Sequence, residues 1–359
     1  MFAVAELVQC VAGNLHTLQC ATSAEKFAAT VCRMTEHFAN TLTAKSDIVA
    51  LAAVAGAGAA SAQVTLYGKA DLGYSSKTTK DAAGVTTSKS SGMHSGYQSG
   101  SRWGLKGSED LGGGLKASFN YEASIGANTG SGNDNFARRS VLELSGSFGK
   151  IGMGRDYNPY FGVVGFSDVT GVDGSSTNNL LGGVRTSNMF LYTSPSFSGV
   201  TVKFGYSGNS ATDAGLTNKT TSTDFSVTYG NGPVKVAFAQ QTNKPTVDSV
   251  AGTKTTNTAI GATYDLGMAK VYFNNLSSKT SPVTLKETNL AVSVPMGAAT
   301  LLAGYGRNSA TGEKSATDYV FGADYSLSKM TNVYARVNKR GAVGGGKTTG
   351  MAVGLRHSF

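Results

Sequence analysis

The chain is poor in charge, in proline and in long apolar runs. Of its 359 residues, 15% are charged, 6 are proline and 40% are hydrophobic. A soluble domain with so little charge, against an ordinary share of about a quarter, would normally have a large apolar core. A helical membrane protein would instead carry runs of about 18 or more apolar residues. The sequence has neither, which favours strands with one apolar face and one polar face.

Cysteine and histidine are also scarce. The 3 cysteines all precede residue 63, so residues 63–359 offer no disulfide, thiolate nucleophile or cysteine metal site. That range holds two histidines, His94 and His357, and neither has a recognisable serine motif beside it. We therefore expect no catalytic activity, no metal site and no cofactor. A calcium site made of acidic loop residues stays open.

The first 62 residues are predicted to be an N-terminal extension followed by a cleaved signal peptide. An apolar stretch, residues 48–60, lies between Lys45 and a small-residue Ala-Ser-Ala pattern that ends at Ala62. The stretch is too short to span a bilayer as a helix. We expect cleavage after Ala62, which leaves residues 63–359 as the barrel domain.

Residues 1–44 are longer than a signal peptide requires. Met34 is a candidate for the true start, which would make the upstream residues a start-site artefact. The alternative is a genuine N-terminal extension, and the sequence does not decide between the two.

The charge of residues 63–359 is positive. They carry ten more basic than acidic residues, spread over the predicted strands rather than gathered in a tail. Scattered charge argues against nucleic-acid binding, for which a basic patch or stripe would be expected. A net positive charge favours anionic solutes or partners.

Short segments of alternating apolar and polar residues recur from residue 64 to the C-terminus. Every second residue from Leu115 to Tyr121 is apolar or aromatic, with polar residues between them. This period of two predicts strands with one apolar face. In the third predicted strand the set from Leu115 to Tyr121 should face outward. In the fourteenth strand we expect Val320 and Gly322 on the outward face.

The connections between these segments alternate in length. Tight turns are predicted at 111–114, 147–149, 230–233, 266–268 and 296–298, and long polar loops at 75–100, 126–136, 156–187, 210–221 and 244–255. Short periplasmic turns and longer extracellular loops are typical of outer-membrane barrels. The pattern predicts an all-β, transmembrane antiparallel barrel of sixteen strands. Fourteen or eighteen strands fit as well if the segment edges are moved.

Several motifs resemble one family. Residues 99–117 (SGSRWGLKGSEDLGGGLKA) are similar to the second strand and first turn of Gram-negative general diffusion porins, most closely those of the β-proteobacterial type. Residues 138–149 (RRSVLELSGSFG) with Gly154-Arg155 resemble the next hairpin, and YTSP at 192–195 and VGLRHSF at 353–359 also match. The resemblance covers roughly residues 63–359. Glu143 departs from it, because a small residue is more usual there.

The resemblance implies a passive channel in the outer membrane of a Gram-negative bacterium, open to small hydrophilic solutes and ions. It implies a sixteen-stranded barrel, a homotrimer, and a third loop that folds into the pore. Membrane lipid and lipopolysaccharide would surround the barrel. The terminal Phe359 resembles the signal that hands such barrels to the barrel assembly machinery.

The resemblance also implies which residues form the pore constriction. The third loop, residues 156–187, would narrow the pore and contribute Asp168 and Asp173. Basic residues of the wall would face it, and alternation with Leu142 and Leu144 adds Arg139 to them. The predicted basic set is Lys69, Arg102, Arg139, Arg155 and Arg185.

Arg155 needs a special geometry to belong to this set. Alternation with Ile151 and Met153 would aim its side chain at lipid, and a β-bulge would be needed to turn it inward. The alternative is that all these arginines have only a structural role and pair with acidic groups near strand ends. If they do line the constriction, the excess of bases predicts a mild preference for anions.

Two other functions compete with a channel. An outer-membrane adhesin would need neither an inward-folded loop nor opposed charges across the lumen. A barrel enzyme would need a fixed triad centred on a histidine. Residues 341–348 (GAVGGGKT) match a phosphate-binding loop, but an alternating strand follows them instead of the required helix, so we set nucleotide binding aside.

Overall fold

The computed structural model of the chain describes residues 64–132, 135–170, 182–213, 216–247 and 250–359. These residues form one helix, α4 (Pro159–Phe166), and nineteen strands. The strands are β1 (Thr65–Lys80), β2 (Thr86–Ser95), β3 (Arg102–Gly112), β4 (Leu115–Gly126), β5 (Ser131–Gly132), β6 (Arg139–Gly146), β7 (Gly149–Tyr157), β8 (Arg185–Thr193), β9 (Val200–Asp213), β10 (Leu216–Asn231), β11 (Val234–Val247), β12 (Val250–Ala251), β13 (Thr255–Asp265), β14 (Lys270–Thr280), β15 (Val283–Met296), β16 (Ala299–Ala310), β17 (Ala316–Ser326), β18 (Thr331–Gly341) and β19 (Lys347–Ser358).

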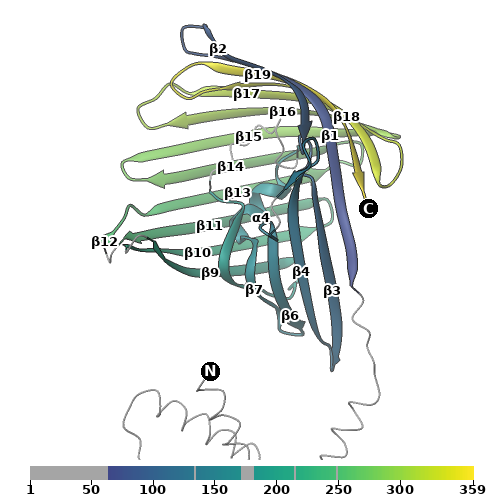
Figure 1. The fold of residues 1–359 in the computed structure, drawn as a ribbon, viewed down its shortest axis with the longest axis vertical. Coiled ribbons are helices and arrows are strands. Elements are labelled where there is room, and N and C mark those ends of the chain that lie inside the picture. The colour runs from purple at the N-terminus through teal and green to yellow at the C-terminus, as the bar shows by residue number, and fades with distance from the viewer. Residues whose placement is uncertain (1–63, 133–134, 171–181, 214–215, 248–249) are drawn as a thin grey trace, which may run out of the picture. The chain divides into compact units, whose positions relative to one another are not determined.

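Antiparallel pairing joins these strands into one closed ring (Figure 1). β1 closes the ring by pairing with β19, from Lys69 opposite Ser358 to Lys80 opposite Lys347. β2 and β3 share one position beside β1. β2 pairs with the second half of β1, and β3 pairs with the first half of β1. β5 and β12 are two-residue strands within connections. The described strands thus fill sixteen positions, which confirms the predicted sixteen-stranded barrel.

Side chains alternate between the inside and the outside of the ring, and the two sets differ in polarity. On β18, Val333 and Val337 are exposed on the outer face, while Tyr334 and Arg336 beside them are 4% and 2% exposed. Many large apolar side chains are exposed, whereas many buried side chains are polar or charged. This reverses the arrangement of a soluble core and suits lipid outside and water inside.

The predicted outward face of the fourteenth strand, β17, is wrong by one residue. Tyr319 and Phe321 are 39% and 56% exposed, whereas Val320 is 0% exposed. Gly322 shares the inward phase, and a Cβ there would meet the Arg336 side chain. Residues 319–321 are all apolar, so their alternation does not reveal which face is outward. On β4 the predicted phase is right, with Tyr121 exposed and its inward neighbour buried.

The tight turns are confirmed, but the long loops are shorter than predicted. Most of 75–100 is strand, in β1 and β2, and the described parts of 210–221 and 244–255 are also largely strand. These hairpins extend beyond the apolar segments. In β1 the residues after Tyr74 are Ser, Thr and Lys, so the apolar alternation stops there while the β structure continues.

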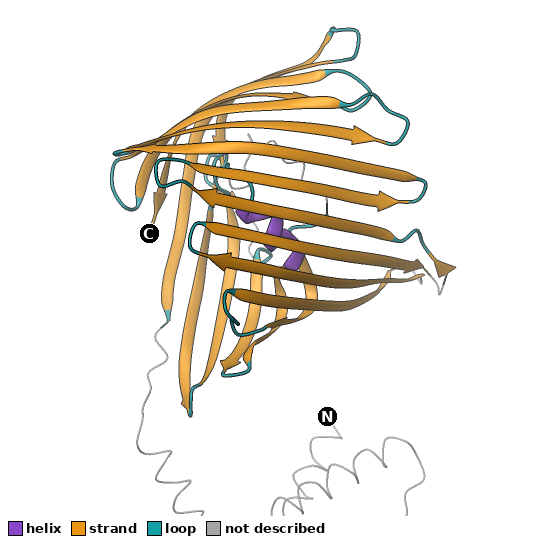
Figure 2. Ribbon diagram, turned by 180° about the vertical axis from the view of Figure 1, so that it is seen from behind, coloured by secondary structure: helices purple, strands orange, loops and turns teal. Residues whose placement is uncertain are grey.

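The helix α4 lies inside the ring, as Figures 1 and 2 both show. It belongs to the connection between β7 and β8, which is the third of the longer connections, so the predicted inward-folded third loop is confirmed. Asn158 caps the helix by accepting a hydrogen bond from the Phe161 N–H at 2.7 Å, and Pro159 occupies its first turn. No helix of the described residues is long and apolar enough to cross a membrane.

Candidate functional site

One side of the interior is shaped to receive α4. Tyr160, Val163 and Val164 of the helix are each 1% exposed. They pack against a patch of small and apolar side chains on the ring: Ala237 and Ala239 of β11, Ala259 of β13 and Leu276 of β14. Gly261 of β13 completes the patch, because a Cβ there would lie 3.0 Å from the Val163 side chain. The helix can therefore lie close against the sheet.

Polar contacts fix both ends of α4 to the same side. The N–H of Tyr160 interacts with the carboxylate of Asp224 on β10. At the other end, the Asn274 side-chain amide of β14 donates to the Ser167 carbonyl at 3.1 Å. Burial raises the pKa of the Tyr160 hydroxyl, and the negative charges of Glu287 and Asp224 act in the same direction, so the hydroxyl stays protonated. We call the side formed by β10–β15 the amide wall.

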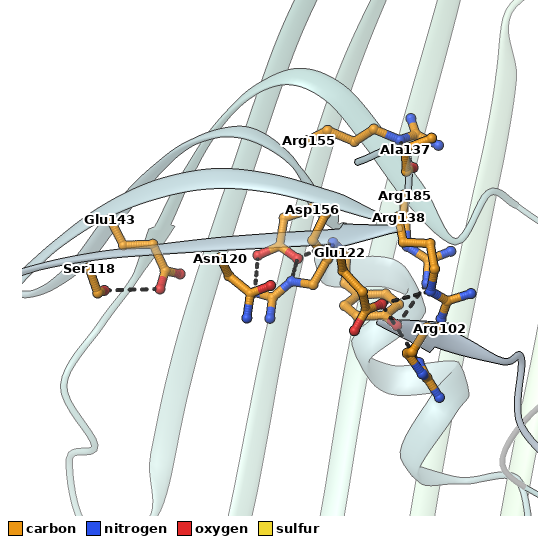
Figure 3. Close-up of polar contacts among 12 residues, drawn as sticks. Arg102, Ser118, Asn120, Glu122, Ala137, Arg138, Glu143, Arg155, Asp156 and Arg185 are labelled. Carbon is orange, nitrogen blue, oxygen red and sulfur yellow. Dashed lines mark hydrogen bonds and ion pairs between the residues drawn. The ribbon is translucent and has the colours of Figure 1, made fainter. Parts of the chain in front are cut away.

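The opposite side of the interior carries a group of arginines around Glu122 of β4. Glu122 is 5% exposed. Its carboxylate lies 2.7 Å from Arg138 Nε and 3.7 Å from Arg102 Nη1, and it accepts a hydrogen bond from the Tyr67 hydroxyl at 3.1 Å. Figure 3 shows Arg102, Arg138 and Arg185 converging beside Glu122. We call the side formed by β3–β8 the arginine wall.

A second ion pair on the arginine wall joins β6 to β7. Both oxygens of Asp156 accept hydrogen bonds from Arg139, from Nε and Nη2, each at 2.7 Å. Asp156 is 5% exposed, and its Oδ1 also accepts the Tyr157 N–H at 2.7 Å. Bidentate pairing of this kind fixes the guanidinium plane as well as its position. Arg139 therefore faces inward, in the direction that its alternation predicts.

Arg185 of β8 is held by an aromatic side chain instead of an acid. Its Nη2 donates to the Tyr157 hydroxyl at 2.8 Å, and its guanidinium lies 4.4 Å from the centroid of the Tyr157 ring. The Tyr157 ring in turn stacks on Phe161 of α4, with centroids 5.2 Å apart and planes 17° apart. Arg185 is thus linked to the helix through two aromatic rings.

Lys69 joins this group through its place in the sheet. It stands opposite Arg102 in the pairing of β1 with β3, and therefore on the same inward face. It lies within electrostatic range of Arg102 and Arg356 and of the acids Asp71 and Glu122. Its ammonium adds to the positive charge at this level of the interior.

Arg155 lies apart from the other arginines (Figure 3). The register of β7 against β8 shifts between Gly154 and Asp156, at the place where a bulge was required. The Arg155 side chain donates to the Ala137 carbonyl at 2.5 Å and to the Ser187 hydroxyl at 2.7 Å. It binds neighbouring segments of the wall rather than Glu122 or Asp156.

Of the two acids predicted in the third loop, the structure describes Asp168. Asp168 follows α4 and is 7% exposed, and its Oδ1 accepts the Thr170 N–H at 2.9 Å and the Thr170 hydroxyl at 2.7 Å. Asp173 lies outside the described residues. Two acids of the wall, Glu122 and Asp156, pair with Arg138 and Arg139.

Sequence reasoning missed Glu122 and Arg138. Glu122 follows the outward Tyr121 and so lies in the inward phase, which was a usable signal. Arg138 precedes β6, where no alternation applies, and its inward direction follows only from its contact with Glu122.

The described charges at this level are unequal. The basic side chains are Lys69, Arg102, Arg138, Arg139, Arg185 and Arg356, and the acidic ones are Asp71, Glu122 and Asp156, so six bases accompany three acids. An excess of fixed cations in a polar passage attracts anions and repels cations.

Comparison with known proteins identifies relatives. A family model described as Gram-negative porin matches residues 49–341. The chain is 34% identical over 226 residues to outer membrane porin protein 32 of Delftia acidovorans, covering 58% of this chain and 62% of the relative. It is 37% identical over 222 residues to an outer membrane porin protein of Bordetella pertussis, covering 53% and 56%. The chain therefore spans about three fifths of the length of these curated relatives.

Solved structures share the architecture. An anion-selective porin from Comamonas acidovorans matches with a TM-score of 0.71 at 28% identity, over 83% of this chain and 100% of that one. OmpF of Salmonella typhi matches with a TM-score of 0.63 at 16% identity, over 83% and 98%, and shows the fold alone. With the family model covering most of its length and a closed barrel of porin architecture, the chain belongs to the Gram-negative porin family and is an outer-membrane β-barrel.

Proposed function

We propose that residues 63–359 form a passive channel for small hydrophilic solutes and ions, with a mild preference for anions. The observation that carries this proposal is the excess of basic over acidic side chains on the arginine wall, at the level where α4 occupies the interior. Passage would be selected by the width left beside the helix and by the charge that lines it.

The two walls support this function in different ways. α4 packs on the amide wall and so takes up part of the interior. The remaining space borders the arginine wall, where Arg139 and Arg185 are held in fixed positions by Asp156 and Tyr157. Fixed charge on one side creates a field across the passage, which orients water and polar solutes and favours anions.

The proposed constriction set is Lys69, Arg102, Arg139, Arg155, Arg185, Asp168 and Asp173, extended by Arg138 and Glu122. Arg155 and Asp168 would contribute by holding neighbouring segments of the chain in place. Arg155 binds Ala137 and Ser187, and Asp168 binds Thr170. The matched structure described as an anion-selective porin supports the direction of the preference.

Neither alternative function gains a specific observation. An adhesin would not need a helix docked inside the barrel, and α4 is docked there. The family and the fold are those of channels, and we propose no catalytic role.

We also propose how the chain reaches and occupies the membrane. Cleavage after Ala62 would release residues 63–359, which would assemble as a homotrimer among lipid and lipopolysaccharide. Phe359 would serve the barrel assembly machinery as a terminal signal. Its backbone pairs with Gly68, by N–H to O at 3.1 Å and O to N–H at 2.9 Å, and its side chain is half exposed at the seam of β1 and β19. Mass spectrometry of outer-membrane material should find Gln63 at the N-terminus, and intact residues 1–62 there would contradict the cleavage.

Planar-bilayer recording of the purified protein tests the channel and its preference together. The protein should give stepwise ion-passing openings, and the reversal potential in a KCl gradient should have the sign of chloride preference. The double variant Arg102→Gln/Arg185→Gln should shift the reversal potential toward cations, because it removes two of the six basic groups at this level.

The double variant Lys279→Gln/Lys286→Gln is the matched control. Both lysines are exposed on the outer face near the ends of β14 and β15, so the same loss of charge should leave the reversal potential unchanged. Absence of openings would reject the channel. Openings with an unshifted reversal potential in Arg102→Gln/Arg185→Gln would reject the assignment of the constriction and leave the channel standing.

A further inference from the structure

Each of five strands has a lysine near its start, and these strands are every second one from β4 to β14 around the ring. These strands run away from the short-turn end, which is the periplasmic end of an outer-membrane barrel. In each of them the lysine falls within the first four residues. The strands are β4, β7, β9, β11 and β14, and the lysines are Lys116, Lys150, Lys203, Lys235 and Lys270, which we call the lysine collar.

The collar faces the interior. Lys203 is in phase with the buried Gly205 and Ser207 of its strand, and Lys235 is in phase with the buried Ala237 that packs under α4. The Lys235 ammonium lies 4.1 Å from the centroid of the Phe166 ring, at the end of α4. Since α4 is inside the ring, this contact places Lys235 in the passage, on the periplasmic side of the helix.

Neighbouring members of the collar lie close enough to act together. Lys150 and Lys203 both stand opposite Thr193 of β8, from its two sides. Strands in a sheet are about 4.8 Å apart, so the two lysine backbones are roughly 10 Å apart. Lys203 lies within electrostatic range of Lys150 and Lys235, and Lys235 within range of Lys270. Lys150, Lys203, Lys235 and Lys270 therefore form a row, and Lys116 extends it because Lys116 and Lys150 both stand opposite Ser145 of β6.

The acids near the collar neutralise only part of it. Lys150 Nζ pairs with Glu143 at 2.6 Å. Asp110 stands opposite Lys116 and Asp265 opposite Lys270 in the sheet, and Asp265 also accepts the Gly267 N–H at 2.8 Å. Within the described part of the chain, Lys203 and Lys235 form no ion pair.

We propose that the lysine collar is a second anion-binding site, at the periplasmic mouth, that takes small multivalent oxyanions such as polycarboxylates. The proposal rests on the channel function and adds a site that lies nearer the short-turn end than the ion pairs of Glu122 and Asp156. An ammonium on a flexible stem is a point charge that can follow a ligand. A single carboxylate engages one lysine, whereas a tricarboxylate can engage two neighbours in the row.

A site on one side of the constriction makes the channel unequal from its two ends. A multivalent anion entering from the periplasm reaches the collar before it reaches α4 and the arginines around Glu122. While the anion is bound to the collar, it blocks the ion current. The same anion entering from the extracellular end must first pass the constriction. Raised local concentration of a counter-ion at a charged mouth is the physical basis of this difference.

Single-channel recording with citrate on one side at a time tests the collar. Citrate on the periplasmic side should reduce conductance at a concentration at least about threefold lower than on the extracellular side. Acetate at equal ionic strength should show no such difference. Because residues 63–359 lack cysteine, Ser315→Cys in the exposed turn after β16 allows each inserted channel to be oriented with an impermeant thiol reagent.

Two separate double variants test the lysine collar. If one of them does not fold, the other still tests the proposal. Lys235→Gln/Lys270→Gln and Lys150→Gln/Lys203→Gln should each bring the citrate effect from the two sides toward equality. The outward Lys279→Gln/Lys286→Gln should keep the difference, and so should Arg102→Gln/Arg185→Gln, although the latter shifts the reversal potential.

Equal citrate effects from both sides in the unmodified channel, or a difference that survives both collar variants, would overturn the collar. A matching difference with acetate would overturn its preference for multivalent anions. These failures are distinguishable from failure of the proposed function, because a channel that opens and prefers chloride can still respond equally to citrate from both sides.

Discussion

The amide wall and the arginine wall both bury carboxylates, but they balance them with different groups. On the amide wall, Asp224 and Glu287 are each 1% exposed and accept hydrogen bonds from amides, Gln241 at 3.1 Å and Asn289 at 2.8 Å. On the arginine wall, Glu122 and Asp156 are paired with guanidinium groups at 2.7 Å. Amides satisfy a carboxylate without adding charge, whereas guanidinium groups bring charge of their own.

This difference separates two tasks inside one barrel. The amide wall offers small side chains and neutral donors, which suit the docking of a helix whose buried face is apolar. The arginine wall has more bases than acids and leaves them beside the passage, which suits selection by charge. The comparison predicts that damage to the first wall changes mainly the width of the passage, and damage to the second changes mainly its ion preference.

The largest effect should come from a charge placed under the helix. Ala259 is 0% exposed and packs against α4, so Ala259→Glu would bury a carboxylate at a cost of several kcal/mol. The helix should leave its position, and single-channel conductance should rise. Liposome swelling should also admit larger sugars than it does with the unmodified protein.

Ala259→Ser is the matched control, because it keeps the small volume and adds no charge. Its conductance should stay close to that of the unmodified channel. If Ala259→Glu folds and keeps the original conductance, α4 does not narrow the passage, and the division of tasks between the walls fails.

A smaller effect should follow from removing the acid at the centre of the arginine wall. Glu122→Gln leaves Arg102 and Arg138 without their shared carboxylate, and breaking a buried ion pair in this way costs about 3 kcal/mol. The midpoint of urea unfolding should fall, and the reversal potential should move further toward chloride.

Asp224→Asn sharpens the comparison, because it makes the same charge change on the amide wall. The partners of Asp224 are Gln241, Ser222 and the Tyr160 N–H, so no cation is left unpaired. It should lower the unfolding midpoint less than Glu122→Gln does. Equal losses would mean that the two walls do not differ in how they balance buried charge.

The period of two in the sequence was enough to predict the barrel and the inward direction of Arg139. The alternation of short and long connections gave sixteen strands, with fourteen and eighteen left open. The period of two failed on β17, because Tyr319, Val320 and Phe321 are all apolar and leave the phase undecided. Alternation also gives no signal in segments whose side chains do not face lipid and the lumen in turn. The hairpin of β1 and β2 continues as strand after its apolar residues end, and Arg138 precedes the strand that would have given it a phase.

The helix was beyond prediction from local pattern. α4 contains Gly162 and Gly165 among aromatic and apolar residues, with no polar face to mark it as a surface helix. Its position depends on a patch assembled from β11, β13 and β14, far away in the sequence. The partners of the arginines are likewise determined by the tertiary structure and not by the local sequence. Loop membership predicts Asp168 and Asp173 for the constriction, but it does not reveal contacts such as those of Asp168 with Thr170.

The smallest predicted effect concerns Tyr157, which touches both the arginine wall and α4. Its hydroxyl accepts a hydrogen bond from Arg185, and its ring stacks on Phe161. Tyr157→Phe removes only the hydroxyl, at a cost of about 1 kcal/mol. The Arg185 Nε is already buried without a partner among the described residues, so loss of a second contact should loosen the guanidinium.

Tyr157→Phe should therefore lower the unfolding midpoint slightly and make the open-channel current noisier, while conductance and reversal potential stay nearly unchanged. Tyr157→Ala removes the ring as well, so it should also disturb α4 and raise the conductance. The two variants differ only in the ring, which connects the walls. If they behave alike, the hydroxyl alone carries the role of Tyr157, and the position of the helix does not depend on the arginine wall.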